Sequence, residues 1–309
     1  MNDIFVNLKR FDVPRKMGGI CPEEQPVKWI ENVIENSVKE GLGQLKDLKV
    51  TYLLPEALLI PAINKLNEYP ETKITGIEIG SQSVFREDVT EDGNFGAFTT
   101  NLPAAAVSNL GCTWSIIGHS EERADKLGLL QEYEPKIEDD SNLRKKASET
   151  VHKIINQEVN RALSQNINVL LCVGETEAER GEGSFEEQKP RIKEVLKEQL
   201  LLGLAGVEQY LPQRKIIIGY EPIWAIGPGK TPPGEEYISF VSAYIKEVIK
   251  EEFNFEAGVV YGGGLKEENA RMIAGIDTID GGLVALTKFT GDIAFEPEGL
   301  RKIIEKYLD

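Results

Sequence analysis

Histidine and cysteine are scarce in this sequence, with two and three residues among 309. The cysteines, Cys21, Cys112 and Cys172, are odd in number and far apart, which argues against a disulfide framework and is typical of a reducing compartment. The two histidines are also distant, so histidine and cysteine form no cluster with the spacing of metal ligands. We therefore expect neither a disulfide nor a metal ion.

Long hydrophobic runs are missing as well. No stretch approaches the roughly 18 apolar residues of a membrane-spanning helix. The N-terminal residues MNDIFVNLKRFD carry charges too early, and their apolar stretch is too short, for a secretory signal. We expect a cytoplasmic protein without a membrane partner.

Basic residues are outnumbered by acidic ones, 35 against 51, which gives a net charge of −16. Nucleic acids require clustered lysine and arginine, so the charge balance excludes them as partners. A small anionic substrate is still compatible, because one buried lysine and a few oriented amides can reverse the local field.

Short apolar runs alternate with helical patterns along the whole chain. Eight runs of apolar or β-branched residues occur at 4–8, 50–54, 77–79, 114–117, 169–173, 216–220, 259–261 and 282–286. Helical three-to-four spacing occurs at 26–39, 104–110, 147–163, 185–201, 235–253, 267–273 and 297–307. Such alternation indicates parallel strands covered by helices, and eight pairs favour a closed (β/α)8 barrel of the α/β class. We predict a single domain over residues 1–309, with an open sheet as the alternative.

Two segments are longer than connections need to be. One is 11–25, and the other is the charged segment 127–148 with the acidic sequence EYEPKIEDD. Long loops in compact domains are usually functional or disordered. A run of charges is most often a solvated face, so we interpret both segments as surface insertions.

Polar residues follow several of the predicted strands. In a (β/α)8 barrel the active site lies at the carboxyl ends of the strands, so these residues are the candidates for chemistry. They are Asn7 and Lys9 at the first strand, His119 and Glu121 after the fourth, Glu221 after the sixth, and the glycines 262–264 after the seventh. The other histidine, His152, lies in a helical pattern, and we expect its side chain at the surface. A purely structural role for His119 or Glu221 is the alternative reading.

The segment EPIWAIGPGK, residues 221–230, begins with a carboxylate and has Gly-Pro-Gly near its end. An apolar cover makes a carboxylate a stronger base, so Glu221 is a candidate general base. Gly227-Pro228-Gly229 can act as a hinge that closes the segment over a substrate. The sequence GPGKT is not a nucleotide-binding loop, because the first glycine of that motif would fall at Trp224.

The chain resembles the triosephosphate isomerase family, in order and through nearly its whole length. The segments that carry the resemblance are NLK at 7–9, GSQ at 80–82, GAFT at 96–99, IIGHSEER at 116–123, LLCVGET at 170–176, GYEPIWAIGPGKT at 219–231 and VVYGGG at 259–264. The resemblance implies a TIM barrel without a cofactor that interconverts an aldose and a ketose through an enediolate. It places the protein in glycolysis, gluconeogenesis and carbohydrate metabolism.

The resemblance also implies roles for individual residues. Glu221 would abstract the proton beside the carbonyl, and His119 would polarise the carbonyl oxygen. Asn7 and Lys9 would stabilise the developing oxyanion, with Glu121 holding Lys9. Together these residues supply what proton transfer next to a carbonyl needs.

Departures from the family cluster at the phosphate end. The expected phosphate-binding positions are Gly227, Gly263, Gly264, Ala285 and Leu286. The family usually has serine at the third of these and a glycine pair at the last two. Backbone amides can still bind a phosphate there, although the larger side chains narrow the approach. An arginine of the family is also replaced, by Glu122.

Three hypotheses follow for the function. The first is interconversion of dihydroxyacetone phosphate and glyceraldehyde 3-phosphate; the second is isomerisation of a related small sugar phosphate such as a tetrulose phosphate, suggested by the altered phosphate end. The third is a non-catalytic barrel that binds a sugar phosphate or a protein. The third loop, 82–98, is longer than we expect for the family, where it docks into a second subunit, and we expect a homodimer.

Overall fold

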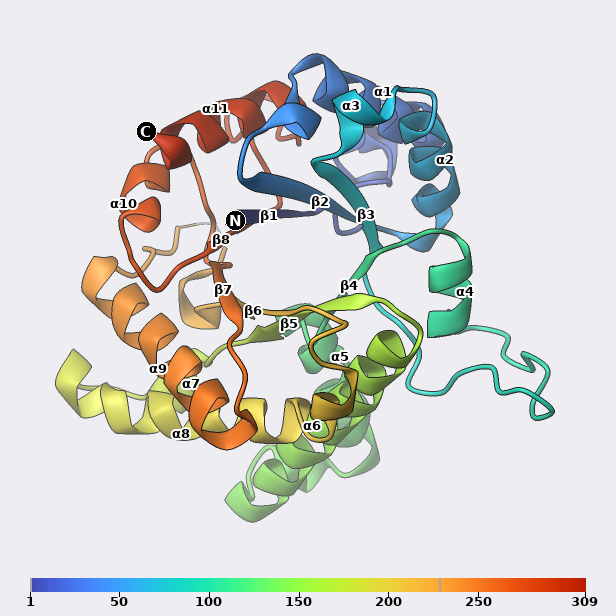
Figure 1. Ribbon diagram of the computed structural model, residues 1–309. Helices are drawn as coiled ribbons and strands as arrows, with labels where there is room; N and C mark the ends of the chain where they lie inside the picture. Colours follow the sequence, from blue (N-terminus) through green and yellow to red (C-terminus); the bar gives the residue numbers. More distant parts are fainter. Residues whose placement is uncertain (1, 228) are drawn as a thin grey trace.

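A computed structural model describes residues 2–227 and 229–309, and it shows a closed barrel of parallel strands surrounded by helices (Figure 1). The strands pair in sequence order, and the last pairs with the first. This architecture confirms the predicted α/β class and (β/α)8 fold. The strands are β1 (Asn2–Asn7), β2 (Leu48–Leu54), β3 (Ile77–Ser81), β4 (Trp114–Ile117), β5 (Asn168–Val173), β6 (Ile216–Tyr220), β7 (Gly258–Tyr261) and β8 (Gly281–Val284).

The helices form the outer ring. They are α1 (Pro26–Lys39), α2 (Glu56–Leu66), α3 (Glu71–Ile74), α4 (Ala104–Asn109), α5 (Ser120–Tyr133), α6 (Ser141–Ser164), α7 (Glu177–Arg180), α8 (Phe185–Gly203), α9 (Glu235–Phe253), α10 (Ala270–Ala274) and α11 (Pro297–Leu308). Local signals fix several helix starts: the Asp140 side chain caps α6, and Ser184 and Glu187 form a capping box at α8. None of the helices in the described ranges has the length and apolar composition to cross a membrane.

The hydrophobic core has two layers. Strand side chains that point inward fill the barrel and include Phe5, Trp114, Leu170 and Val260. Strand side chains that point outward pack under the helices in a larger cluster. Because both faces of every strand are buried, the strands appear in the sequence as continuous apolar runs rather than as alternating patterns.

The eighth strand is shorter than predicted. It ends at Val284, so Ala285 and Leu286 lie in the connection to α11 rather than in the strand. The chain then turns back on itself, and Lys288 pairs with Ala294 in an isolated antiparallel bridge. The apolar character of residues 285 and 286 extended the sequence pattern beyond the end of the sheet.

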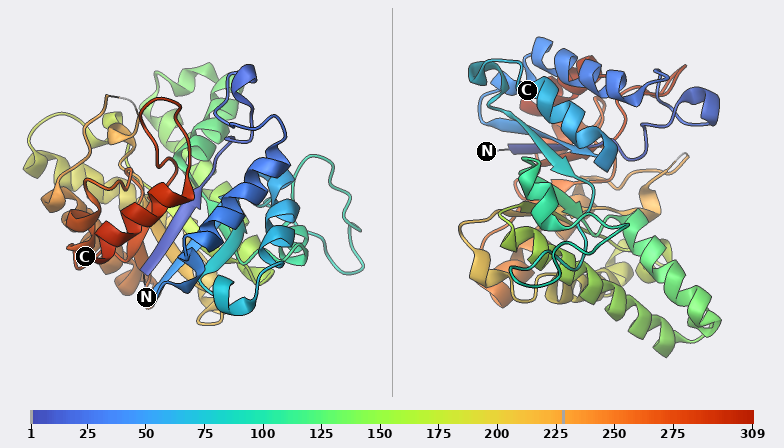
Figure 2. Two further views of the ribbon diagram at one scale, coloured as in Figure 1. Left: turned by 90° about the horizontal axis from the view of Figure 1, so that it is seen from above. Right: turned by 90° about the vertical axis from the view of Figure 1, so that its right-hand side faces the viewer.

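The charged segment 127–148 is helical. It contains the end of α5, a 3₁₀ turn at Pro135–Ile137 and the start of α6, which together form a projecting helical hairpin (Figures 1 and 2). Ile137 and Ala147 are buried within this hairpin, so its charges line the outside of a packed structure. The segment 11–25 contains another 3₁₀ turn, at Arg15–Met17, and a bridge from Pro14 to Cys21.

A long arm connects β3 to α4. Residues 83–103 leave the barrel and project from its side, as both figures show. Phe95, in the middle of this segment of the sequence, is 89% exposed. The arm therefore presents an apolar residue well away from the core.

Candidate active site

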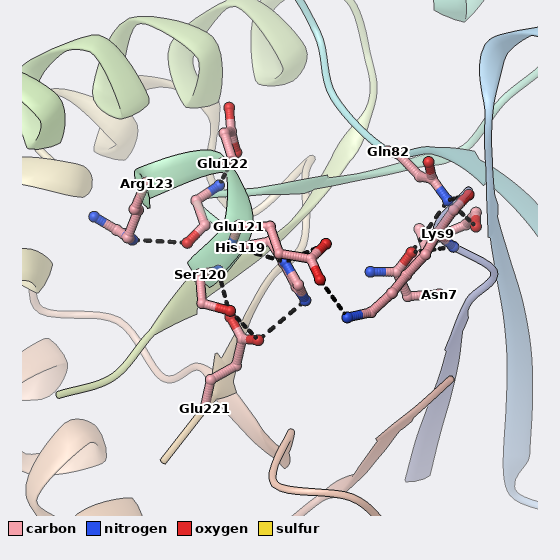
Figure 3. A network of polar contacts seen from close by, with 11 residues as sticks. Asn7, Lys9, Gln82, His119, Ser120, Glu121, Glu122, Arg123 and Glu221 are labelled. Atoms are coloured by element: carbon pink, nitrogen blue, oxygen red, sulfur yellow. Dashed lines mark hydrogen bonds and ion pairs between the residues drawn. The ribbon is translucent and has the colours of Figure 1, made fainter. Parts of the chain in front are cut away.

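The predicted site residues come together at the carboxyl ends of the strands (Figure 3). Asn7 is the last residue of β1, and Glu221 directly follows β6. His119 lies two residues beyond β4 and is the N-cap of α5. Parallel strands that end on one face of a barrel place these distant residues around one centre.

The Glu221 carboxylate is buried, with 3% of the residue exposed. Its Oε2 accepts the backbone N–H of Ser120 at 3.0 Å, and its Oε1 accepts the Ser120 hydroxyl at 3.2 Å. The Ser120 N–H belongs to the first turn of α5, whose dipole favours a negative charge. A Cβ on the neighbouring Gly174 would lie 1.8 Å from the carbonyl oxygen of Glu221, so glycine is required there. The carboxylate is thus held firmly despite its burial.

The His119 imidazole faces Glu221. Its Nε2 lies 3.1 Å from the Glu221 Oε1, and its Nδ1 accepts the backbone N–H of Glu121 at 3.3 Å. A ring nitrogen that accepts a hydrogen bond carries no proton, so this geometry assigns the proton to Nε2. The ring therefore presents an N–H donor to the centre of the site.

Lys9 occupies the other side of the site, and its ammonium contacts Glu121 Oε1 at 2.6 Å. Burial opposes the ionisation of Glu121, but the Lys9 ammonium prevails and lowers the pKa of that carboxyl. The backbone of Lys9 has a φ of +42°, in the region that favours glycine. Asn7 Oδ1 accepts the Lys9 N–H at 3.0 Å, and Gln82 Nε2 donates to the Lys9 carbonyl at 2.9 Å. These bonds hold a strained backbone that aims the ammonium.

Two residues at the site had no predicted role. Ser120 binds both oxygens of Glu221, and Gln82 donates to Asn7, Lys9 and Leu53. Both follow strands at the same face of the barrel, so the rule that pointed to His119 also covers them. Their side chains are polar but do not titrate, so the residue type alone gives no signal of a catalytic role.

The expectation for His152 was wrong. Its side chain is buried, and its Nδ1 lies 2.9 Å from Arg123 Nη1, which donates to it. Burial and the Arg123 charge lower the pKa of His152 to about 3, so the ring is neutral. His152 supports Arg123 from α6 and lies outside the constellation around Glu221.

The predicted phosphate-binding residues lie on three loops at the same end of the barrel. Gly263 and Gly264 follow β7, Ala285 and Leu286 follow β8, and Gly227 follows the 3₁₀ turn at Ile223–Ala225. Gly227 and Gly264 have φ values of +119° and +93°, which suit glycine alone. Pro228, the middle residue of the predicted hinge, lies outside the described residues.

No group of three histidine, cysteine, aspartate or glutamate side chains able to hold a metal ion occurs in residues 2–227 and 229–309. The polar side chains that gather at the site are two carboxylates, an imidazole, an ammonium, a hydroxyl and two amides.

A carboxylate in contact with an N–H donor, at the carboxyl end of a (β/α)8 barrel, defines a barrel enzyme that transfers protons between neighbouring atoms of its substrate. Comparison with known proteins narrows this class. The triosephosphate isomerase family profile matches residues 31–305, so the chain belongs to the triosephosphate isomerase family. It is accordingly an isomerase of the intramolecular oxidoreductase class.

Individual relatives agree with this assignment. The chain is 33% identical over 270 residues to the triosephosphate isomerase of Alkaliphilus metalliredigens, a match that covers 85% of this chain and 93% of that one. It is 32% identical over 213 residues to that of Chloroherpeton thalassium, covering 68% and 70%. The crystal structure of triosephosphate isomerase from Bartonella henselae shares the fold with a TM-score of 0.66 at 20% identity, covering 100% of this chain and 99% of that chain.

Proposed function

We propose that this enzyme interconverts dihydroxyacetone phosphate and glyceraldehyde 3-phosphate. The observation that supports this most is the pairing of Glu221 and His119, whose Oε1 and Nε2 are 3.1 Å apart. A carboxylate and an N–H donor at this separation can act on adjacent carbon and oxygen atoms of a bound carbonyl compound. Family membership favours this activity over a non-catalytic barrel.

The reaction begins with a movement of the base. Both Glu221 oxygens are hydrogen-bonded to Ser120 in the structure, so the carboxylate must leave this partner to reach a substrate carbon. It then takes a proton from the carbon next to the carbonyl, while His119 Nε2–H donates to the carbonyl oxygen. His119 then recovers a proton from the hydroxyl group on the carbon that Glu221 deprotonated, and Glu221 gives its proton to the former carbonyl carbon, so the carbonyl and hydroxyl groups exchange places.

Lys9 and Asn7 stabilise the charge that develops on the oxygen. The Lys9 ammonium is held by Glu121, and the Asn7 amide is held by Gln82, so neither group needs to reorganise during the reaction. Donors fixed in advance around a developing oxyanion contribute about 3–4 kcal/mol each to lowering a barrier.

A second candidate substrate is a longer ketose phosphate, such as a tetrulose phosphate. The phosphate site of such barrels is frequently formed by the loops after strands 7 and 8 and by the N-terminus of a short extra helix. Within residues 229–309 no helix lies between β8 and α11, and the chain instead forms the turn closed by Lys288 and Ala294. A changed anion site is expected to accept a phosphate at a different distance from the carbonyl.

We further propose a homodimer that acts in the cytoplasm, in glycolysis and gluconeogenesis. The projecting arm 83–103, with Phe95 exposed on it, supports self-association because an exposed apolar side chain is stabilised by a partner. The metabolic role follows from the family.

Steady-state kinetics with both trioses and with a tetrulose phosphate tests the proposal. We expect the highest kcat/KM with the trioses, and a loss of about 10²–10⁴-fold in Glu221→Gln, the size of a general base contribution. A higher kcat/KM for the four-carbon ketose would favour the second candidate. Wild-type rates no faster than those of Glu221→Gln would contradict both.

A further inference from the structure

The peptide groups on either side of Gly118 are held by two side chains of the helix that follows. Glu122 Oε2 accepts the Gly118 N–H at 2.6 Å, and Arg123 Nε donates to the Gly118 carbonyl at 2.7 Å (Figure 3). Gly118 has a φ of +76°, and a Cβ there would lie 2.8 Å from Arg123 Nη2. Gly118 immediately precedes His119, so these two bonds set the direction in which the chain enters the active site.

Both side chains are themselves anchored. Arg123 is buried, and its Nη2 donates to the carbonyl of Cys172 on β5 at 2.8 Å, while its Nη1 donates to His152 on α6. Glu122 Oε1 accepts from Lys126 at 2.6 Å, and Lys126 also contacts Glu158 Oε1 at 3.0 Å. The clamp on Gly118 is therefore tied to β5 and to α6.

The carboxyl groups of Glu122 and Glu158, which both contact Lys126, differ in charge. Burial and the neighbouring Glu122 carboxylate raise the pKa of Glu158 well above its usual range, so Glu158 is protonated at neutral pH. Burial opposes the ionisation of Glu122, but hydrogen bonding from Glu158 and the Lys126 charge lower its pKa. The Glu158 Oε2 is buried and has no hydrogen-bond partner among the described residues. Glu122 keeps the negative charge that its bond to Gly118 uses.

We propose that Glu122 is a positioning residue for His119, acting through the backbone N–H of Gly118. The inference rests on the proposed function, because it concerns the residue assigned there as the proton donor. A carboxylate that accepts this N–H restrains the backbone of residues 118 and 119. The backbone of His119 then determines where the imidazole Nε2 points. Displacement of a catalytic group by about 1 Å can reduce a rate about 100-fold, so a bond beyond the substrate's reach can affect turnover.

Two nearly isosteric variants test this role. Glu122→Met removes the acceptor for Gly118, whereas Glu122→Gln retains an amide oxygen in its place. We expect Glu122→Met to lower kcat about 10- to 100-fold with little change in KM, and Glu122→Gln to recover most of the rate. Glu132→Met, which removes an exposed carboxylate elsewhere on α5, serves as the matched control and is expected to stay near the wild-type kcat. Equal losses in the Met and Gln variants would overturn the proposal.

Glu122→Asp repeats the test if the Met variant does not fold. It preserves the charge but withdraws the carboxylate by one methylene, so we expect a lower kcat with KM unchanged. A kcat equal to that of the wild type in a folded Asp variant would contradict a positioning role.

A measurement without substrate separates this inference from the proposed function. The imidazole ¹⁵N signals of His119 report its tautomer, and His119→Gln identifies them among the signals of two histidines. We expect these signals to shift in Glu122→Met and to stay at their wild-type positions in Glu122→Gln. Unchanged signals in Glu122→Met would overturn the inference, even in an enzyme that converts the trioses. If the wild type converts neither candidate substrate, the proposed function fails while this spectrum still decides the role of Glu122.

Discussion

At the scale of single residues, Lys9 combines a strained backbone with the ammonium group that is proposed to stabilise the oxyanion. Its φ of +42° costs about 1–3 kcal/mol in a residue other than glycine. We expect Lys9→Gly to melt at a higher temperature than Lys9→Met, because both lose the ammonium but only glycine relieves the strain. Both variants should lose activity about 10²-fold or more, as expected for removal of a preorganised charge. Thermal unfolding and kcat measurements test both expectations. If Lys9→Met is as stable as Lys9→Gly, the backbone at residue 9 is not strained.

Glu158 gives a second prediction at this scale, concerning stability and pH. Burial and Glu122 raise its pKa from 4.5 to about 9, with Lys126 opposing the shift. Between these values the folded chain binds a proton that the unfolded chain has released, so the free energy of unfolding falls as pH rises through this window. Glu158→Gln imitates the protonated carboxyl but does not titrate.

We therefore expect Glu158→Gln to melt progressively higher than the wild type between pH 6 and pH 9. Each kcal/mol of difference corresponds to roughly 2 °C in a chain of this size. Glu186→Gln, on the exposed surface of α8, is the control and should show a constant difference. A pH-independent gap for Glu158→Gln would rule out the raised pKa.

The sequence predicted residues whose position follows from the ends of strands, and it failed for residues whose position depends on helix packing. Glu221 and His119 follow apolar runs, so the barrel geometry placed them together. His152 and Glu158 lie in α6, where the three-to-four pattern identifies a helix but not which polar residues its neighbours will cover. The buried contact of His152 with Arg123 depends on α5, whose own apolar pattern is weak, and it was therefore not predictable.

At the scale of elements, a buried carboxylate fastens one end of the segment predicted to close over the substrate. Glu175 Oε1 accepts from Trp224 Nε1 at 2.7 Å, from Tyr237 at 2.7 Å and from Tyr220 at 3.0 Å. Trp224 lies in the 3₁₀ turn at Ile223–Ala225, directly before the exposed glycines of the segment. The same oxygen thus links β6, α9 and the start of the predicted lid.

Trp224→Phe should impair the lid by removing one donor to Glu175. We expect kcat and KM to change together, with kcat/KM lowered about tenfold or more, the equivalent of one hydrogen bond to a charged group. Tyr237→Phe removes another donor from the same oxygen without altering the turn, and should affect stability more than kcat/KM. Equal kinetic losses in the two variants would indicate that Glu175 supports the fold rather than the lid.

Elements were predicted best where burial on both faces left no ambiguity. The runs at 114–117 and 216–220 coincide with β4 and β6, because strands that are buried on both faces consist mostly of apolar residues. The run at 282–286 continues past β8 because Ala285 and Leu286 are apolar but unpaired with β1 in the sheet register. The helical structure of the predicted insertion 127–148 was not evident from the sequence, because many charges surround its few buried apolar residues.

At the scale of the whole molecule, the arm 83–103 projects from the barrel (Figure 1) and exposes an apolar side chain. Phe95 is 89% exposed, and we expect it to be a contact in the proposed homodimer. Sedimentation should give twice the chain mass of 34.4 kDa for the wild type. Phe95→Ser should weaken association by about 2 kcal/mol, or roughly 30-fold in Kd, as for an aromatic interface residue. Phe289→Ser, in the loop after β8, is the matched control for an exposed aromatic residue. A monomeric wild type would contradict the homodimer. A Phe95→Ser dimer with the same Kd as the Phe289→Ser dimer would show that the arm is not part of the interface.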